Sequence, residues 1–119
     1  MRHFILMVKL RTAIYYKDSS TGKEPAREWL ESLKDRSGQA RIFTRIVRAE
    51  SGNFGDYRSV GENIFELRID AGPGYRVYYA LDGNDIILLL VAGDKSSQTK
   101  DIEMAKQYWT AHKLESKGG

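Results

Sequence analysis

Apolar and polar residues recur with different periods along this chain, and each change of period marks a predicted element. A strand is predicted over residues 12–17, and the polar run 18–22 that follows has the composition of a loop. Beyond this loop, apolar residues recur at helical spacing. They are Ala26, Trp29, Leu30 and Leu33, and they predict a first helix.

The ends of this first helix have sequence signals of their own. Thr21 and Glu24 have the spacing of a capping box, and Pro25 suits a first helical turn. Ser37 and Gly38 form a pair that favours a break. We therefore expect the helix to begin after Thr21 and to end at Ser37-Gly38.

A second helix is predicted over residues 39–50, with an apolar face formed by Ile42, Phe43, Ile46 and Val47. The opposite side carries Arg41, Arg45 and Arg48, which are spaced so that their guanidinium groups lie together. An ordinary solvated helix face explains such a row. Because Glu50 is the one acidic residue of the segment, the three arginines are also candidates for RNA binding through phosphates.

From residue 63 the period becomes two, which is the signature of a half-buried strand. The apolar set is Phe65, Leu67 and Ile69, and the polar set is Glu66, Arg68 and Asp70. After the turn 71–74 the alternation returns over residues 75–81, so the two strands are predicted to form a β-hairpin. Residues 86–92 are continuously apolar, which indicates a last strand of the meander that is central in the sheet and buried on both faces.

A last helix is predicted after residue 95. Ser96 or Ser97 is expected to cap it, and Asp101 and Glu103 lie in its early turns, where the helix dipole favours anions. Its buried side is formed by Ile102, Ala105, Tyr108 and Trp109.

The order of these elements, β-α-α-β-β-β-α, indicates the α+β class, with a small antiparallel sheet and helices packed on one face. We expect a single domain over residues 1–119. Residues 1–11 are a candidate N-terminal extension, and the polar tail 113–119 is expected to fray.

The composition limits the kinds of site and the cellular compartment that fit this chain. The chain has 119 residues and 41% hydrophobic content, which suits one core. It contains no cysteine, so a disulfide framework and a thiolate zinc site are excluded, and the reducing cytoplasm fits best. The apolar run 4–8 is too short for a signal peptide or a membrane span, so we interpret it as a first strand or as sequence upstream of a true start at Met7. No membrane partner is expected.

The residues offer little for metal or cofactor chemistry. The two histidines, His3 and His112, have no partners at metal-ligand spacing, so both are expected at the surface. The glycines of the turn 71–74 join strand to strand without a helix N-terminus behind them, which is not the arrangement of a phosphate loop. We expect neither a metal nor a cofactor.

The charge of the chain is unevenly distributed. A net charge of +3 permits a polyanionic partner. Residues 1–60 contain 12 basic and 7 acidic side chains, whereas residues 61–119 contain 7 and 9. The basic surplus therefore lies in the first half, around the predicted second helix.

Arg68 and Arg76 are the most informative pair. If the hairpin is centred on its glycine turn, the two arginines lie directly across from each other, and Glu66 lies across from Tyr78. Like charges on facing strands repel, so either Glu66 and Asp70 or a bound anion must compensate.

Lys95 follows the predicted strand 86–92 and lies at the end of the sheet where the strand 75–81 begins. The three cations Arg68, Arg76 and Lys95 are therefore expected to converge on one groove. Tyr78 lies on the polar face and is a candidate to stack on an unpaired base or to transfer a proton. Tyr75 and Tyr79 are assigned to the core. Phosphates together with unpaired bases indicate RNA as the ligand.

Two segments, FELRIDAGPGYRVYY (residues 65–79) and IILLLVAGDKSSQ (residues 86–98), closely resemble the RelE/HigB family of bacterial toxins. More narrowly, they resemble its phage-related addiction module killer protein branch. The resemblance covers about Thr12 to Tyr108, and GYRVYY and GDKSSQ are its most specific parts. It implies a RelE/ParE-like fold, a cognate antitoxin in a hetero-oligomer, and cleavage of mRNA in the A site of a translating ribosome.

Residue by residue, Arg76 matches the arginine after the Gly-Tyr of the family, Lys95 matches the basic residue after the strand that ends in glycine, and Arg68 matches a basic strand position. Two positions depart from the pattern. Glu66 stands where some ribosome-dependent members have a lysine, and Asp101 stands where some have a tyrosine. These departures leave the general base unassigned.

Metal-free cleavage by the 2′-OH of the RNA needs in-line placement, a proton acceptor, and cations for the charge on the phosphorus oxygens. Arg68 and Arg76 suit the cationic role, and Lys95 suits the leaving 5′-oxygen. Glu66 or Tyr78 is the candidate partner of the 2′-OH. Two other functions remain open on the same fold, a ParE-like inhibitor of DNA gyrase and a non-catalytic RNA-binding module.

Overall fold

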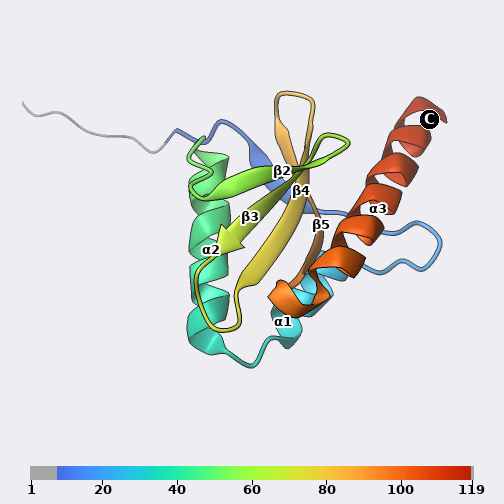
Figure 1. Ribbon diagram of the computed structural model, residues 1–119. Coiled ribbons are helices and arrows are strands. Elements are labelled where there is room, and N and C mark those ends of the chain that lie inside the picture. Colours follow the sequence, from blue (N-terminus) through green and yellow to red (C-terminus); the bar gives the residue numbers. More distant parts are fainter. Residues whose placement is uncertain (1–7, 119) are drawn as a thin grey trace, which may run out of the picture.

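The computed structural model describes residues 8–118 (Figure 1), so the expectations for residues 1–7, including the choice between Met1 and Met7, lie outside the described residues. The elements are β1 (Thr12–Tyr15), α1 (Pro25–Ser32), α2 (Arg36–Glu50), β2 (Tyr57–Gly61), β3 (Ile64–Ile69), β4 (Tyr75–Asp82), β5 (Ile86–Asp94), the short 3-10 helix η1 (Lys95–Ser97) and α3 (Gln98–Gly118). The predicted α+β class is confirmed.

The sheet has five strands in the order β1-β5-β4-β3-β2. β2 to β5 form an antiparallel meander, as predicted for the hairpin and the strand after it, whereas β1 pairs in parallel with β5. The sheet is therefore mixed and not purely antiparallel. β2 was not predicted, because this short edge strand is exposed almost throughout and shows no apolar alternation. It joins β3 through a tight turn in which Gly61, Glu62 and Asn63 all have positive φ.

Helices cover both faces of this sheet. Val77 and Tyr79 of β4 belong to the buried cluster that contains Leu30 of α1 and Ile42 of α2, so these two helices share one face as expected. Tyr78 and Ala80, which alternate with them along β4, belong to a second cluster that contains Ala105 and Trp109 of α3. α3 thus adds a layer on the other face, and Figure 1 shows the sheet between α2 and α3.

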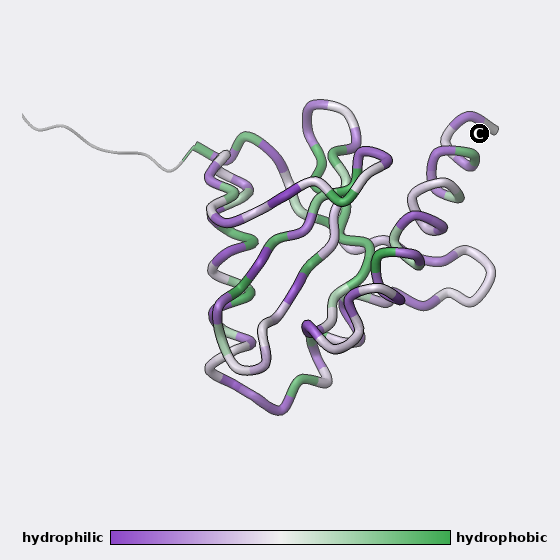
Figure 2. Tube along the Cα trace, viewed as in Figure 1, coloured by the Kyte–Doolittle hydropathy of each residue, from purple (hydrophilic) through white to green (hydrophobic). Residues whose placement is uncertain are grey.

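β5 explains why two helical layers are needed. Leu89 belongs to the first cluster and Leu90 to the second, and a register irregularity opposite Tyr78 and Tyr79 places Val91 in the second cluster too. The continuous apolar run is therefore buried on both faces, which confirms the prediction for this strand. Figure 2 shows apolar and polar residues alternating along the helices and strands around it.

The predicted ends of the first helix are wrong. Glu24 and not Thr21 occupies the N-cap position, without a side-chain capping bond, whereas Pro25 is in the first turn as predicted. Thr21 belongs to the preceding turn, where its hydroxyl donates to Asp18. α1 ends at Ser32, because Leu33 has extended backbone angles.

Ser37 and Gly38 do not break a helix but lie in the first turn of α2. Asp35 caps this helix by accepting a hydrogen bond from the Gly38 amide at 2.9 Å. A glycine is needed here because a Cβ atom would overlap the Tyr75 ring.

The apolar face of α2 is also rotated from the prediction. Ile42 and Ile46 are buried as expected, but Phe43 is 37% and Val47 is 55% exposed. Gly38 and Ala49 complete the buried stripe instead. Small residues contribute to this contact, and a search for large apolar side chains misses them.

The C-terminal end of α3 differs from the prediction. At its N-terminal end, Asp94 caps the short turn η1 by accepting from the Ser96 amide at 2.8 Å, and α3 begins at Gln98, directly after Ser97. The helix continues to Gly118 and includes most of the tail that was expected to fray. His112 is half-buried and lies 2.7 Å from the Asp82 carboxylate, so it is not a free surface residue. No helix within residues 8–118 has the length and apolarity needed to cross a bilayer.

Candidate functional site

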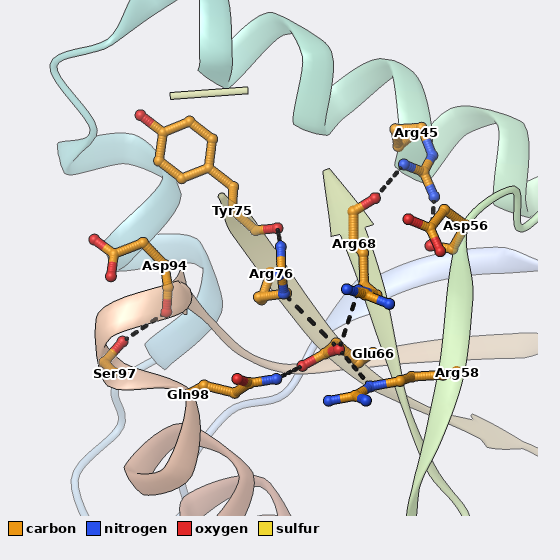
Figure 3. A network of polar contacts seen from close by, with 10 residues as sticks. All are labelled: Arg45, Asp56, Arg58, Glu66, Arg68, Tyr75, Arg76, Asp94, Ser97 and Gln98. Carbon is orange, nitrogen blue, oxygen red and sulfur yellow. Dashed lines mark hydrogen bonds and ion pairs between the residues drawn. The ribbon is translucent and has the colours of Figure 1, made fainter. Parts of the chain in front are cut away.

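The hairpin of β3 and β4 brings together most of the predicted site residues. Arg68 is paired with Arg76 and Glu66 with Tyr78, which confirms the predicted register. All four side chains point away from the α1/α2 cluster, because Leu67 and Val77 between them pack into it. Figure 3 shows the resulting polar network.

Glu66 is the centre of that network, and its side chain is fully buried. Its Oε1 lies 3.0 Å from Nε of Arg58 and 3.8 Å from Nε of both Arg68 and Arg76. Its Oε2 accepts a hydrogen bond from Gln98 at 2.7 Å. One carboxylate therefore faces three guanidinium groups, which makes its burial tolerable and leaves the cluster with a positive surplus.

The predicted compensation of the arginine pair is confirmed for Glu66. The Asp70 carboxylate forms no ion pair with any residue between 8 and 118. Sequence reasoning missed Arg58, which lies on the strand that was not predicted, and Gln98, which reaches Glu66 from the start of α3. A β2 prediction would have found Arg58, because it is paired with Glu66 in the strand register.

Arg76 is the buried cation of the group, with 8% of its side chain exposed. Its Nη1 donates to the carbonyl oxygen of Tyr75 at 3.0 Å, while its buried Nε makes no hydrogen bond within the described part of the chain. The distance of 3.8 Å to Glu66 is an ion pair without a hydrogen bond. Arg76 thus keeps donor capacity, and a buried guanidinium interacts with anions in a weakly screened environment.

A pocket of about 330 Å³ opens beside this pair. Its lining residues are Asp56, Arg68, Ile69, Asp70, Gly72, Pro73, Gly74, Arg76 and Lys95. The predicted convergence of Arg68, Arg76 and Lys95 is therefore confirmed. Gly74 allows the turn to enter β4 with a φ of +87°, in the left-handed region that favours glycine. Asp56 and Asp70 line the pocket together with the three basic residues, so the surplus of positive charge in the pocket is moderate.

Tyr78 does not have the predicted exposure. It is fully buried beneath α3, in the cluster with Ala105 and Trp109, because α3 covers this part of the face. Burial, followed by the negative charge of Glu66, raises the pKa of its phenol well above the ordinary value. A ring in this position cannot stack on a base, and its hydroxyl stays protonated at neutral pH. Glu66 is also below the pocket wall and not on it.

The three arginines of α2 are not an equivalent row. Arg45 donates to the carbonyl oxygens of Arg68, Phe54 and Asp56, and Arg41 donates to that of Asp70 at 2.9 Å. The three arginines line a neighbouring groove of about 470 Å³. Arg48 is exposed and forms no hydrogen bond or ion pair with another side chain of residues 8–118.

Asp101 is a second buried carboxylate near the site. Ser97 donates to it at 2.6 Å, and a Cβ atom on Gly93, which is paired with Arg76, would overlap it. Burial is the main cause that raises the pKa of this carboxyl group. Within the part of the chain that the structure describes, no group of three or more His, Asp or Glu side chains is arranged to hold a metal ion.

Comparison with known proteins places the chain in a family. It is 53% identical to an uncharacterized protein of Haemophilus influenzae over 78 residues, which are 66% of this chain and 79% of that relative. The sequence model of the family described as "Phage derived protein Gp49-like (DUF891)" matches residues 28–110, which include the hairpin, the pocket and Asp101. The chain therefore belongs to the Gp49-like family of phage-derived proteins, a family associated with addiction-module killer toxins.

Proposed function

We propose that this protein is the toxin of a type II toxin–antitoxin module and that it acts as a ribosome-dependent mRNA endoribonuclease. The observation that carries the proposal is the convergence of Arg68, Arg76 and Lys95 on one pocket, on a chain of the Gp49-like family. The proposed partners are a cognate antitoxin, with which the toxin forms a hetero-oligomer, and mRNA on the ribosome. The proposed location is the cytoplasm.

The proposed reaction is metal-free. The 2′-oxygen of the RNA attacks the adjacent phosphorus and forms a 2′,3′-cyclic phosphate, while the bond from phosphorus to the 5′-oxygen breaks. The 2′-OH gives up a proton and the leaving 5′-oxygen takes one. Arg68 and Arg76 stabilise the negative charge that grows on the phosphorus oxygens, and Arg76 does so from a buried position where electrostatic interactions are strong. Lys95 is exposed at the pocket rim and serves the leaving oxygen.

Neither of the two predicted proton acceptors, Tyr78 and Glu66, is placed to take the proton of the 2′-OH. Tyr78 is buried with a raised pKa, and Glu66 lies beneath the arginines, where it holds them in place. Positioning and charge stabilisation are therefore the contributions that the protein itself makes. We propose that the ribosome supplies the remaining alignment of the RNA, so that cleavage of free RNA is slow.

The experiment compares Arg68→Gln and Lys95→Gln with Arg27→Gln as a matched control. Arg27 lies on α1, away from the pocket, and its side chain is 51% exposed against 41% for Arg68. Purified proteins are added to programmed ribosomes and to the same mRNA free in solution, and the new 5′ ends are mapped. The proposal predicts cutting on ribosomes by the wild type and the Arg27 variant, and strong loss in the two pocket variants.

Three outcomes would contradict the proposal. Equal cutting of free and ribosome-bound mRNA would remove the ribosome dependence. Growth arrest with a DNA-damage response and without new mRNA ends would instead support a DNA gyrase inhibitor. Binding of RNA without cutting would support the non-catalytic module. Co-expression with the product of an adjacent small gene tests the antitoxin, which is expected to restore growth.

A further inference from the structure

We propose that Arg45 is a positioning residue that fixes Arg68 in the pocket and does not itself bind RNA. The inference rests on the proposed function, because the activity that Arg68 serves is the one proposed above. It also changes the interpretation of the α2 arginines, which the sequence presented as one phosphate-binding row.

The guanidinium of Arg45 is occupied by three main-chain oxygens. Its Nη1 donates to the carbonyl oxygen of Arg68 at 2.6 Å. Its Nη2 donates to the carbonyl oxygens of Phe54 at 2.9 Å and Asp56 at 3.0 Å. The amide of Arg68 donates to the same Asp56 oxygen at 2.9 Å. Figure 3 shows Arg45 reaching from α2 toward Arg68 near the end of β3 and toward Asp56, which directly precedes β2.

These contacts hold the backbone of two residues that line the pocket. Arg68 and Asp56 both line the pocket, and Arg45 donates to the backbone carbonyl oxygen of each. Gly55 between Phe54 and Asp56 has a φ of +61°, and a Cβ atom there would lie 3.1 Å from Nη2 of Arg45. The loop therefore folds closely around the guanidinium. Without that group, three carbonyl oxygens lose a donor, and the end of β3 keeps only the Arg41 bond to the Asp70 carbonyl as its side-chain hydrogen bond from α2 within residues 8–118.

Charge alone does not explain this arrangement. A guanidinium presents several donors in a rigid plane and can bridge separate carbonyl oxygens, whereas an ammonium is a point charge. Arg48 lies one helical turn away on the same side of α2, is exposed, and has no such contacts within residues 8–118. Arg48 is therefore a matched control for a cation that acts by its charge.

The first test uses Arg45→Lys and Arg45→Met beside Arg48→Lys and Arg48→Met, with cleavage measured on programmed ribosomes. Misplacement of a reacting group by a distant substitution costs up to about 100-fold. In both Arg45 variants we expect kcat to fall by about 10- to 100-fold, with little change in KM. Arg48→Met removes a candidate RNA-binding cation of the neighbouring groove, so we expect it to raise KM more than Arg48→Lys does, whereas Arg27→Met on α1 is expected to keep the wild-type kcat and KM. An Arg45→Lys variant with the wild-type kcat would overturn the inference, because lysine keeps only the charge.

The second test separates positioning from a general loss of stability. Arg68→Met is combined with Arg45→Met, because effects that act through one residue are not additive. The double variant is expected to cut no more slowly than Arg68→Met alone. If the two losses multiply, Arg45 acts independently of Arg68 and the inference is wrong.

The third test does not depend on activity. In Arg45→Met, amide hydrogen exchange is expected to rise in residues 54–58 and 66–70 and to stay unchanged in residues 86–92 of β5. Unchanged exchange throughout, or a uniform rise, would overturn the inference. If the wild type cuts no RNA at all, the proposed function fails, and this measurement still decides whether Arg45 holds the strand ends.

Discussion

Tyr75 at the start of β4 donates a hydrogen bond to Asp35, with its Oη 2.8 Å from Oδ2. The other oxygen of the same carboxylate caps α2 at the Gly38 amide. Gly72 of the hairpin turn lies against this contact, since a Cβ atom there would be 3.0 Å from Tyr75 Oη and 3.3 Å from Asp35 Oδ2. Asp35 therefore joins the beginning of α2 to the turn that forms one wall of the pocket.

This contact predicts an acid-sensitive contribution to stability. The Gly38 amide first, and the Tyr75 hydroxyl second, hold the pKa of Asp35 below its ordinary value of 3.8. A carboxyl group with a lower pKa in the folded state stabilises the fold at pH values above its unfolded pKa, and the stabilisation is lost as the pH falls through the folded pKa. The difference in free energy of unfolding between wild type and Asp35→Ala should therefore be full above about pH 5 and shrink toward about pH 2.

Urea titrations of wild type and Asp35→Ala across this pH range measure the difference. Glu31→Ala on α1 is the control, because 60% of its side chain is exposed. A difference for Asp35 that does not change with pH would show that the carboxylate contributes nothing to stability through its charge.

Glu66→Gln should destabilise the protein strongly. The substitution keeps the shape of the side chain and removes the charge that faces Arg58, Arg68 and Arg76. Loss of one partner of a buried ion pair costs about 3–5 kcal/mol, and we expect the lower end because Arg58 and Arg68 can turn toward water. Chemical denaturation measures the change.

The control for this substitution is Glu62→Gln. Glu62 lies 3.8 Å from Lys106, and its side chain is 66% exposed. Its change in the free energy of unfolding should stay within about 0.5 kcal/mol. Similar values for the two variants would mean that the buried carboxylate does not stabilise the arginine cluster.

Gly93→Ala should disturb the start of α3. A Cβ atom at this position would overlap the Asp101 carboxylate and lie 2.8 Å from Oγ of Ser97. Overpacking of this kind costs about 1–3 kcal/mol. The cost should fall when Asp101→Ala is present as well, because the overlapping group is then absent. Thermal unfolding of the two single variants and the double variant tests this, and an unchanged cost in the Asp101→Ala background would contradict it.

The hairpin shows which relationships can be predicted from the local spacing of apolar and polar residues. The alternation around Phe65 and Leu67 placed Arg68 opposite Arg76 correctly, because a hairpin pairs residues that are close in sequence. The same reasoning placed Tyr78 on the correct face but could not show that α3 covers it. It also placed Arg45 correctly on a helix face and missed its three carbonyl partners.

The sequence by itself determined the presence of the three helices, the hairpin with its facing arginines, and the buried strand β5, because these follow from residue spacing within short segments. Only the tertiary structure decided that β1 joins β5 in parallel, that Gln98 meets Glu66, and that α3 buries Tyr78. These relationships bring together segments that are far apart in the chain. The contacts of Arg45 are harder still to foresee, because every residue has a main-chain carbonyl and none is marked in the sequence.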